Sequence, residues 1–490
     1  MQNSHNKQIL DNEGKTQAPS QNKVNRLGTG KIIPLVIEFA IPAIVGMLVN
    51  GAYQVIDSIF LGHGVGELGL STITVASPIM VVFMALSMLI GAGGNALCAL
   101  RLGEGKVKLA EKILGNTVML AIVVSALVAI LAHIPAVIEW LLSLSSATEY
   151  VRPYAQQFIQ IVSLGTIFQV IGMGINNFIR TVGAPVRALV TMIIGAVGCT
   201  FFNAIFVLAL GWGIVGSALA TVFGQAVSAA TVVWYFVKTP NVPIRLRLFN
   251  MALKPTLVKE ILTLGLAAFA IQAGAAIVNV ATNFVLVKYG ALDPLGADNA
   301  LATIGVVQRV AMFLVLPLVG ISIAIQPLLG FNYGARLFSR VRQTVRIGVI
   351  GATLLGTMLW LSVMIFARLV VLTFGIHDEH LVQVTMYALR IMLFMLPIVG
   401  LQIVGSNYFQ ATGQPFKSGL LALTRQLIFL VPALFMLPHI LPSLISSVTP
   451  LESIYFATPV ADTLSVCVTL IFLMIEISRL KKREQNNMAM

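Results

Sequence analysis

The stretch IIPLVIEFAIPAIVGMLVNGAYQVIDSIFL (residues 32–61) decides the fold of this 490-residue chain. It runs for thirty residues without a lysine or arginine, and its apolar residues do not alternate as in an amphipathic strand. A helix needs about 20 apolar residues to cross the hydrocarbon core of a bilayer. The stretch therefore predicts a transmembrane helix, and it raises the question of why Asp57 lies inside it.

The composition extends this interpretation to the whole chain. Hydrophobic residues make up 58% of it and charged residues 10%, whereas a soluble domain carries about 25% charged residues. The three cysteines, Cys98, Cys199 and Cys467, lie in apolar segments and indicate no disulfide framework. We therefore expect a helical membrane protein with many spans.

Twelve spans are predicted when the same length rule is applied along the chain. They cover residues 32–61, 70–99, 113–138, 154–178, 188–210, 213–237, 260–288, 300–330, 347–375, 382–407, 418–440 and 455–478.

The distribution of positive charge tests this count. With the N-terminus in the cytoplasm, the segments on that side hold 25 of the 31 lysines and arginines. One span more or fewer would scramble the alternation, so we expect twelve spans with both termini inside. The net charge of +13 then belongs to the cytoplasmic membrane face and does not indicate nucleic-acid binding.

An internal repeat divides the spans into two sets of six. Residues 177–188 read NFIRTVGAPVRA and residues 407–418 read NYFQATGQPFKS, with an offset of 230 residues. Each copy ends the fourth span of its half and opens a turn, where glycine permits the reversal and proline begins the next helix. The repeat predicts an all-α membrane protein of two pseudo-symmetric six-helix bundles, and such parallel repeats are typical of transporters.

The predicted domains follow from the spans and the repeat. They are a disordered cytoplasmic tail (1–31), a first lobe of six spans (32–237), a linker rich in proline and basic residues (238–259), a second lobe (260–480) and a cytoplasmic tail (481–490).

Asp57 is the leading candidate for a functional residue. It is either an interfacial, solvated aspartate or a carboxylate that exchanges protons and attracts a cationic substrate within the membrane. Tyr53 lies one helical turn earlier on the same face. Pro42 removes a hydrogen bond from the same span and produces either a static kink or a hinge that responds to the charge of Asp57.

Other polar residues lie in the fourth, fifth and sixth spans of the first half. They are Asn176 and Asn177, Cys199 and Asn203, and Thr221. They either bond neighbouring helices to one another or form the wall of a polar cavity.

The second half has its own charged candidates. Asp462 follows Pro459 and either caps a broken helix or pairs with an arginine. Arg309, Arg390 and Arg425 lie within spans and pair either with Asp462 or with helix ends.

No enzyme constellation is found in the sequence. The P-loop pattern G-x-x-x-x-G-K-[ST] is absent, and no cluster of metal ligands is present. We expect a protein that is not an enzyme and needs no cofactor, so any transport is driven by an ion gradient or a partner.

The chain resembles the MATE family of multidrug and toxic compound extrusion transporters, and most closely its DinF-like and MepA-like bacterial branch. The matching stretches are IPAIVGMLVNGAYQVIDSIFLG, NNFIRTVGAPVRALV, GWGIVGSALATVFGQ, QPLLGFNYGA and NYFQATGQPFKSGLLALTRQ. The resemblance implies a V-shaped pair of six-helix lobes in a bacterial cytoplasmic membrane. It also implies a monomer that exchanges organic cations and amphipathic drugs for H+ or Na+.

The resemblance also assigns roles to residues. The acidic residue of the family's first helix matches Asp57, with Tyr53 and Pro42 at the family's spacing before it. A lining asparagine of the fourth helix falls on Asn176, and a threonine of the sixth falls on Thr221.

The fifth helix departs from the family pattern. Many members carry an N-x-x-x-D pattern there, whereas this chain reads CTFFN, with Cys199 and Asn203. One carboxylate and one amide of the usual set are missing, so the resemblance predicts weaker Na+ binding and proton coupling through Asp57.

The alternative function is a lipid or lipid-linked oligosaccharide flippase of the same superfamily. Such proteins line their cavity with many cationic residues, for which Arg309, Arg390 and Arg425 are the candidates in this chain.

Overall fold

The computed structural model describes residues 19–144, 149–376 and 378–488, and the regular structure in these ranges is helical. Within them, 11 helices are long and apolar enough to cross a membrane. A further crossing is formed by α14 (Glu379–Met392) and α15 (Leu396–Ala411), which are bent by 45° at a short break. With this pair counted as one span, the predicted number of twelve is found and the all-α membrane fold is confirmed.

The first half of the chain supplies six spans, two of which contain π-helical segments. They are α3 (Ile32–Val65), α4 (Glu67–Gly103), α5 (Val107–His133), α7 (Arg152–Gln169) with η1 (Val170–Ile175) and α8 (Asn176–Thr181), α9 (Pro185–Asn203) with η2 (Ala204–Ala209), and α10 (Gly213–Lys238). A short helix, α6 (Pro135–Leu144), follows α5.

The second half is built in the same order. Its spans are α11 (Pro255–Gly290), α12 (Ala297–Gly334), α13 (Phe338–Thr373), the bent pair α14 and α15, α16 (Pro415–Leu423) with η4 (Thr424–Leu430) and α17 (Val431–Leu444), and α18 (Pro450–Tyr455) with α19 (Ala457–Met488).

The tenth span differs from its prediction. A continuous helix was expected over 382–407, but the helix ends at Met392 and resumes at Leu396. Pro397 lies in the first turn of α15, where it has no N–H to donate and disfavours helical geometry in the residue before it. Hydropathy shows a span but does not register this break.

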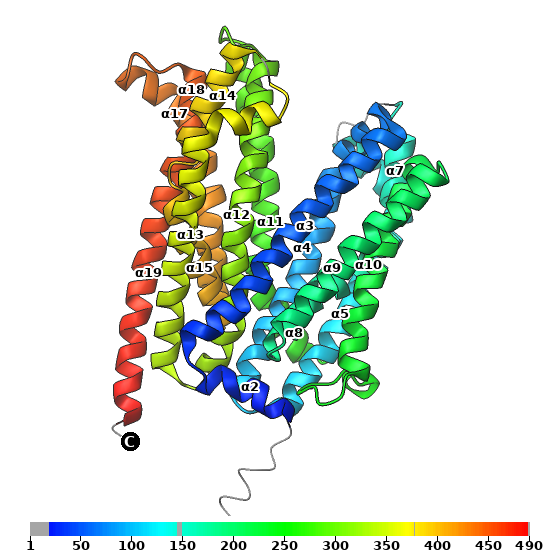
Figure 1. Ribbon diagram of the computed structural model, residues 1–490, viewed down its shortest axis with the longest axis vertical. Helices are drawn as coiled ribbons and strands as arrows, with labels where there is room; N and C mark the ends of the chain where they lie inside the picture. Colours follow the sequence, from blue (N-terminus) through cyan, green and yellow to red (C-terminus); the bar gives the residue numbers. More distant parts are fainter. Residues whose placement is uncertain (1–18, 145–148, 377, 489–490) are drawn as a thin grey trace, which may run out of the picture.

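Figure 1 shows two groups of helices that meet at the lower end of the view and diverge toward the upper end. One group contains α3–α5 and α7–α10, and the other contains α11–α19. Most of the contact between the groups is made by α3 and α4 from the first and by α11 and α12 from the second.

The crossing of α4 and α12 pairs residues at an offset of 231, one residue more than the offset of the repeat. Buried Asn95 donates from Nδ2 to Oε1 of buried Gln326 at 3.1 Å, and these residues are 231 positions apart. The same spacing separates Leu100 from Phe331 and Gly103 from Gly334. A Cβ at Gly103 would overlap the carbonyl oxygen of Phe331, and a Cβ at Gly334 would overlap that of Leu100. The two helices therefore contact each other reciprocally, through equivalent residues.

An ion-pair network lies beside this crossing. Arg101 bonds both Glu104, at 2.9 Å, and Glu260 of the second half, at 3.0 Å. Burial acts to raise the pKa of the Glu104 carboxyl, but hydrogen bonds from Lys106 and Arg101 outweigh it and hold that pKa below its ordinary value. Glu104 therefore stays ionised at neutral pH, and the network joins the halves at the end where they meet.

The N-terminal segment corrects the predicted disordered tail (1–31). Residues 1–18 lie outside the described residues, but Pro19–Thr29 form a helix, α2, with Val24 and Leu27 buried. The carbonyl oxygens of Leu27 and Gly30 accept from Arg340 at 3.1 and 2.7 Å. The apolar residues that sequence reasoning assigned to a tail therefore dock this helix on the second half.

The remaining predicted boundaries shift in the same direction, toward more helix. Helix α11 begins at Pro255, inside the segment assigned to the linker (238–259), and the predicted C-terminal tail continues α19 as far as Met488. The linker lies against α5, since the Lys254 N–H donates to Asn116 at 2.8 Å and the Arg245 N–H donates to Glu111 at 3.0 Å. It is therefore an anchored connection between the halves.

Candidate functional site

Asp57 meets Asn203 inside the first group of helices. Oδ1 of Asp57 accepts a hydrogen bond from Nδ2 of Asn203 at 2.8 Å. Asp57 is half-buried on α3, and Asn203 is fully buried at the end of α9, directly before the π-helical segment η2. This carboxylate has an amide as its partner and no ion pair among the described residues. It is therefore free to change its charge without breaking a salt bridge.

Three further predicted residues surround this pair. Cys199 lies one turn before Asn203, whose amide also donates to the Cys199 carbonyl oxygen at 3.2 Å. Tyr53 is close to both Asp57 and Cys199, and Thr221 on α10 lies beside Cys199. The structure thus brings together five sequence-predicted residues from three helices.

Several buried oxygens of this group lack a hydrogen-bond partner in the described part of the chain. They are Oδ1 of Asn203, Oγ1 of Thr221 and Oε1 of Gln225, the last on the turn of α10 that follows Thr221. Buried polar atoms are normally hydrogen-bonded, so a group of unpaired acceptors beside a carboxylate favours a bound proton, water or cation. We name Asp57, Tyr53, Cys199, Asn203 and Thr221 the Asp57 cluster, and Gln225 lies one helical turn beyond Thr221 on α10.

Asn176 and Asn177 do not join the Asp57 cluster. Buried Asn176 donates from Nδ2 to the carbonyl oxygen of Ala188 at 3.0 Å and to the hydroxyl of Thr191, and so ties α8 to α9. Asn177 accepts from the guanidinium of Arg180. Of the two expectations from the sequence, helix-to-helix bonding describes Asn176 in this structure.

Pro42 is also separate from the cluster. It is buried within α3, which continues through it from Ile32 to Val65. Fifteen residues separate it from Asp57, which is about 22 Å along a helix. Any influence of Pro42 on Asp57 must therefore pass through the shape of α3.

In the second half, Asp462 is paired rather than placed as a helix cap. Nε of Arg425 donates to Oδ1 of Asp462 at 2.6 Å. Asp462 lies inside α19, five positions after its first residue, Ala457. Arg309 and Arg390 are exposed and form no ion pair within the described ranges. Of the three arginines, Arg425 is the one that the structure brings to Asp462.

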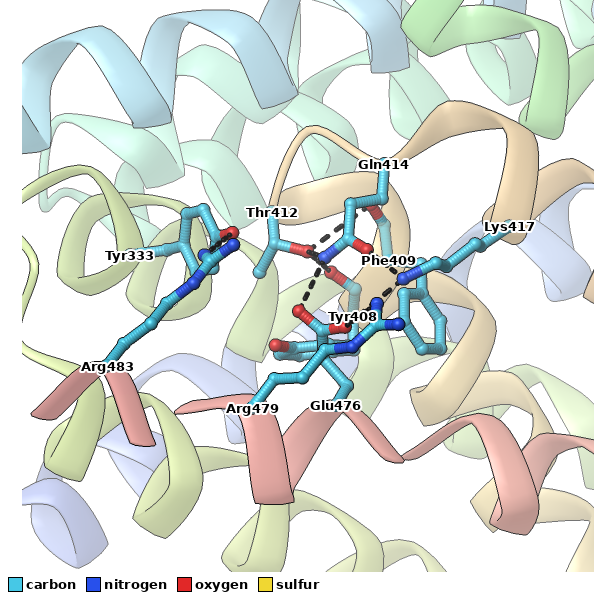
Figure 2. A network of polar contacts seen from close by, with 9 residues as sticks. All are labelled: Tyr333, Tyr408, Phe409, Thr412, Gln414, Lys417, Glu476, Arg479 and Arg483. Carbon is cyan, nitrogen blue, oxygen red and sulfur yellow. Dashed lines mark hydrogen bonds and ion pairs between the residues drawn. The ribbon is translucent and has the colours of Figure 1, made fainter. Parts of the chain in front are cut away.

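A second polar network lies near the lower end of α19, and Figure 2 shows it from close by. Buried Glu476 accepts from Gln414 at 3.0 Å and from Lys417 at 3.2 Å. Both donors belong to the second copy of the repeat, at the turn between α15 and α16. Arg483 donates to Tyr333 at 3.0 Å in the same network. These contacts fix the turn on α19.

Sequence reasoning missed several of these residues. Gln225 follows Thr221 at a spacing of one helical turn, which would have placed both on one face. Arg180 was counted with the cytoplasmic charges, but it is buried and its Nε has no partner among the described residues. Glu476 adjoins the basic C-terminal residues, which conceal it in a hydropathy profile.

The residues that the structure describes contain no group of three or more His, Cys, Asp or Glu side chains arranged to hold a metal ion.

Comparison with known proteins identifies relatives over most of the chain. The sequence model of the family described as MatE matches residues 42–205 and 268–435. The multidrug export protein MepA of Staphylococcus haemolyticus (strain JCSC1435) is 23% identical over 410 residues, which cover 83% of this chain and 87% of that protein.

Solved structures match the fold. One, described as the outward-facing conformation of a multidrug resistance MATE family transporter of the MOP superfamily, has a TM-score of 0.85 at 21% identity. The match covers 93% of this chain and 98% of the chain in that structure. Another, described as MATE in the bent conformation, has a TM-score of 0.83 at 21% identity. That match covers 95% of this chain and 99% of the other chain.

Proposed function

Since the chain belongs to the MATE family of transporters, we propose that it is a secondary active antiporter that exports organic cations and amphipathic drugs in exchange for protons. The observation that carries this proposal is the Asp57 carboxylate, which is held by the neutral amide of Asn203, whose own side-chain oxygen is buried and unpaired among the described residues. Its relatives named multidrug export proteins support the substrate class.

The chemistry of the Asp57 cluster favours protons over sodium. Na+ prefers several hard oxygen ligands with enough negative charge to replace its hydration shell. Asp57 is the one acidic residue of the cluster, and Cys199 contributes a thiol, which is a soft ligand. A proton needs only the carboxylate, so the residues present suffice for proton coupling.

Antiport follows if Asp57 serves the proton and the drug in turn. When ionised, the carboxylate attracts a cation and accepts from Asn203. When protonated, the carboxyl group loses that attraction and gains an O–H donor. The unpaired Oδ1 of Asn203 is an acceptor for this O–H. Because the two occupants compete for one charge, entry of a proton releases the drug.

The orientation is part of the same proposal. The lower end of Figure 1 holds both α2 and the end of α19, so the two described ends of the chain lie on one side. Basic residues gather in the segments assigned to that side, which favours a cytoplasmic location for both ends. We place the protein in a bacterial cytoplasmic membrane as a monomer.

The experiment is dye transport by the purified protein in vesicles, with a pH gradient or a sodium gradient imposed separately. A fluorescent organic cation reports transport, Asp57→Asn removes the charge, and Asp298→Asn makes the same change at an exposed position of α12. We expect transport under the pH gradient alone, its loss in Asp57→Asn and its retention in Asp298→Asn.

Each other result contradicts a defined part of the proposal. Transport driven by sodium would refute proton coupling, and normal transport by Asp57→Asn would refute the role of Asp57. Absence of transport under either gradient would refute the drug antiporter and leave the flippase as the alternative.

A further inference from the structure

The ion pair of Arg425 and Asp462 is arranged with its carboxylate inside and its guanidinium outside. The Asp462 side chain is 4% exposed, whereas that of Arg425 is 26% exposed. Nε is the one guanidinium nitrogen of Arg425 with a hydrogen-bond partner in the described ranges. The outer edge of the guanidinium, formed by its two terminal nitrogens, is therefore accessible and has donors to offer.

The neighbouring residue shows which way this part of the chain faces. Arg425 and Gln426 are consecutive in the π-helical segment η4, which packs against both α11 and α19. Arg425 reaches Asp462 on α19, while Gln426 lies against Gly274 on α11, where a Cβ would overlap its Oε1. Both side chains thus contact neighbouring helices of the second half, and the terminal nitrogens of Arg425 lie at the edge of that contact. Oε1 of Gln426 is a buried acceptor with no partner in the described part of the chain.

Stability alone does not account for such a pair. Taking two charges out of water costs free energy that their attraction seldom repays, and hydrophobic residues in their place are often as stable. Ionisable residues within membrane spans are accordingly rare and mark binding or transport functions. An anchored arginine that presents a free edge is preorganised for an anion, because a planar guanidinium matches a carboxylate with two parallel hydrogen bonds.

We propose that Arg425, held in place by Asp462, binds the acidic group of zwitterionic substrates. This inference rests on the proposed drug transport and adds to it an anion-binding site in the second half. The first half then offers one carboxylate, Asp57, to the cationic group, and the second half offers one guanidinium edge to an anionic group of the same molecule.

A matched pair of probes tests this inference: a rhodamine methyl ester, which is a cation, and the corresponding free carboxylic acid, which is a zwitterion. Binding of each to the purified protein is measured by fluorescence polarisation. Removing one partner alone would leave the other charge buried and unpaired, so the main variant is the double substitution Arg425→Gln with Asp462→Asn. We expect it to bind the acid at least about tenfold more weakly and the ester unchanged, as for the loss of a charged hydrogen bond.

A second variant keeps the measurement informative if the double variant unfolds. Arg425→Lys retains the ion pair but not the flat fork, and we expect an intermediate loss of affinity for the acid. Arg368→Gln is the matched control, because Arg368 forms an exposed ion pair with Glu379 at 3.0 Å in the same half. The control should bind both dyes as the wild type does.

The contradicting results separate this inference from the function it rests on. Equal affinity of wild type and both variants for the acid would overturn the role of Arg425 while leaving export of the ester intact. An equal loss for both dyes would assign the pair a purely structural role and also overturn it. If the wild-type protein bound and transported neither dye, the proposed drug transport itself would be refuted.

Discussion

Asn203 determines how Asp57 is held, because its amide is the donor to that carboxylate at 2.8 Å. An aspartate at this position would place a second carboxylate within hydrogen-bonding reach of the first. Two such groups hold a cation between them or share a proton. The identity of residue 203 therefore bears directly on the coupling ion.

We predict that Cys199→Asn combined with Asn203→Asp creates a sodium site. The two changes add a carboxylate and a carbonyl oxygen to the Asp57 cluster, which are the hard ligands that it lacks. Sodium should then stabilise the variant by about 1.4 kcal/mol at ten times its dissociation constant. Thermal unfolding in sodium and in choline chloride measures this. Cys199→Asn alone is the control, and an equal response of the wild type would contradict the prediction.

At the scale of residues, the sequence reveals charged side chains within apolar spans and misses neutral polar ones. Asp57 is visible because a carboxylate interrupts an apolar span. Gln225 and Gln426 are neutral amides, which membrane helices also use to bond one another, so their sequence positions carry no comparable signal. Their unpaired oxygens become evident only when the surrounding helices are in place.

At the scale of elements, helix α2 is tied to the second half by hydrogen bonds from Arg340 and Asn332. Arg340 donates to the carbonyl oxygens of Leu27 and Gly30, and its Nε also donates to Asn332 at 2.9 Å. Asn332 in turn donates to the Leu27 carbonyl oxygen at 3.0 Å. The C-terminal carbonyls of α2 are thereby satisfied by a side chain of α13 and one of α12.

We predict that Arg340→Ala loosens α2 without unfolding the protein. Loss of hydrogen bonds from a charged donor should lower the free energy of local opening by about 2 kcal/mol, or roughly thirtyfold in hydrogen exchange over residues 24–30. Arg346→Ala, an exposed arginine of the same helix, is the control. Unchanged exchange in Arg340→Ala would show that the other contacts of α2, which are the Asn332 hydrogen bond, the Arg26–Glu38 ion pair and the buried Val24 and Leu27, suffice to hold it.

Hydropathy predicts these elements better than it predicts their interruptions. The spans are long and apolar, so their number follows from length alone. The π-helical segments and the break before Pro397 keep the same hydropathy and alter only hydrogen bonding. Docking of α2 escaped prediction because Val24 and Leu27, which are buried, form no recognisable pattern in the sequence.

For the whole molecule, the crossing of α4 and α12 is a place where the backbones of the two halves approach each other closely. The crossing of α4 and α12 leaves no room for a side chain at Gly103 or Gly334. Transport by alternating access requires that this end separate as the other closes. Its packing therefore contributes to the relative stability of the two states.

We predict that Gly103→Leu destabilises the closed junction. Its side chain would overlap the carbonyl oxygen of Phe331, and such overpacking costs about 1–3 kcal/mol. The thermal midpoint should fall, whereas Gly351→Leu, at a glycine of α13 with open space around it, should leave it unchanged. The same midpoint for both variants would show that the halves separate readily at this crossing.

The reciprocal contact also bears on how such a chain arises. Leu100 with Gly334 and Phe331 with Gly103 are the contacts that two identical half-length subunits would make across an isologous interface. In a homodimer every substitution would be present in both subunits. It would therefore change both equivalent contacts of the interface, or the interior of both subunits, at once. Covalent joining of the halves removes that constraint, so each can change alone. The carboxylate of one half and the guanidinium of the other are the kind of asymmetry that an ancestral homodimer could not possess.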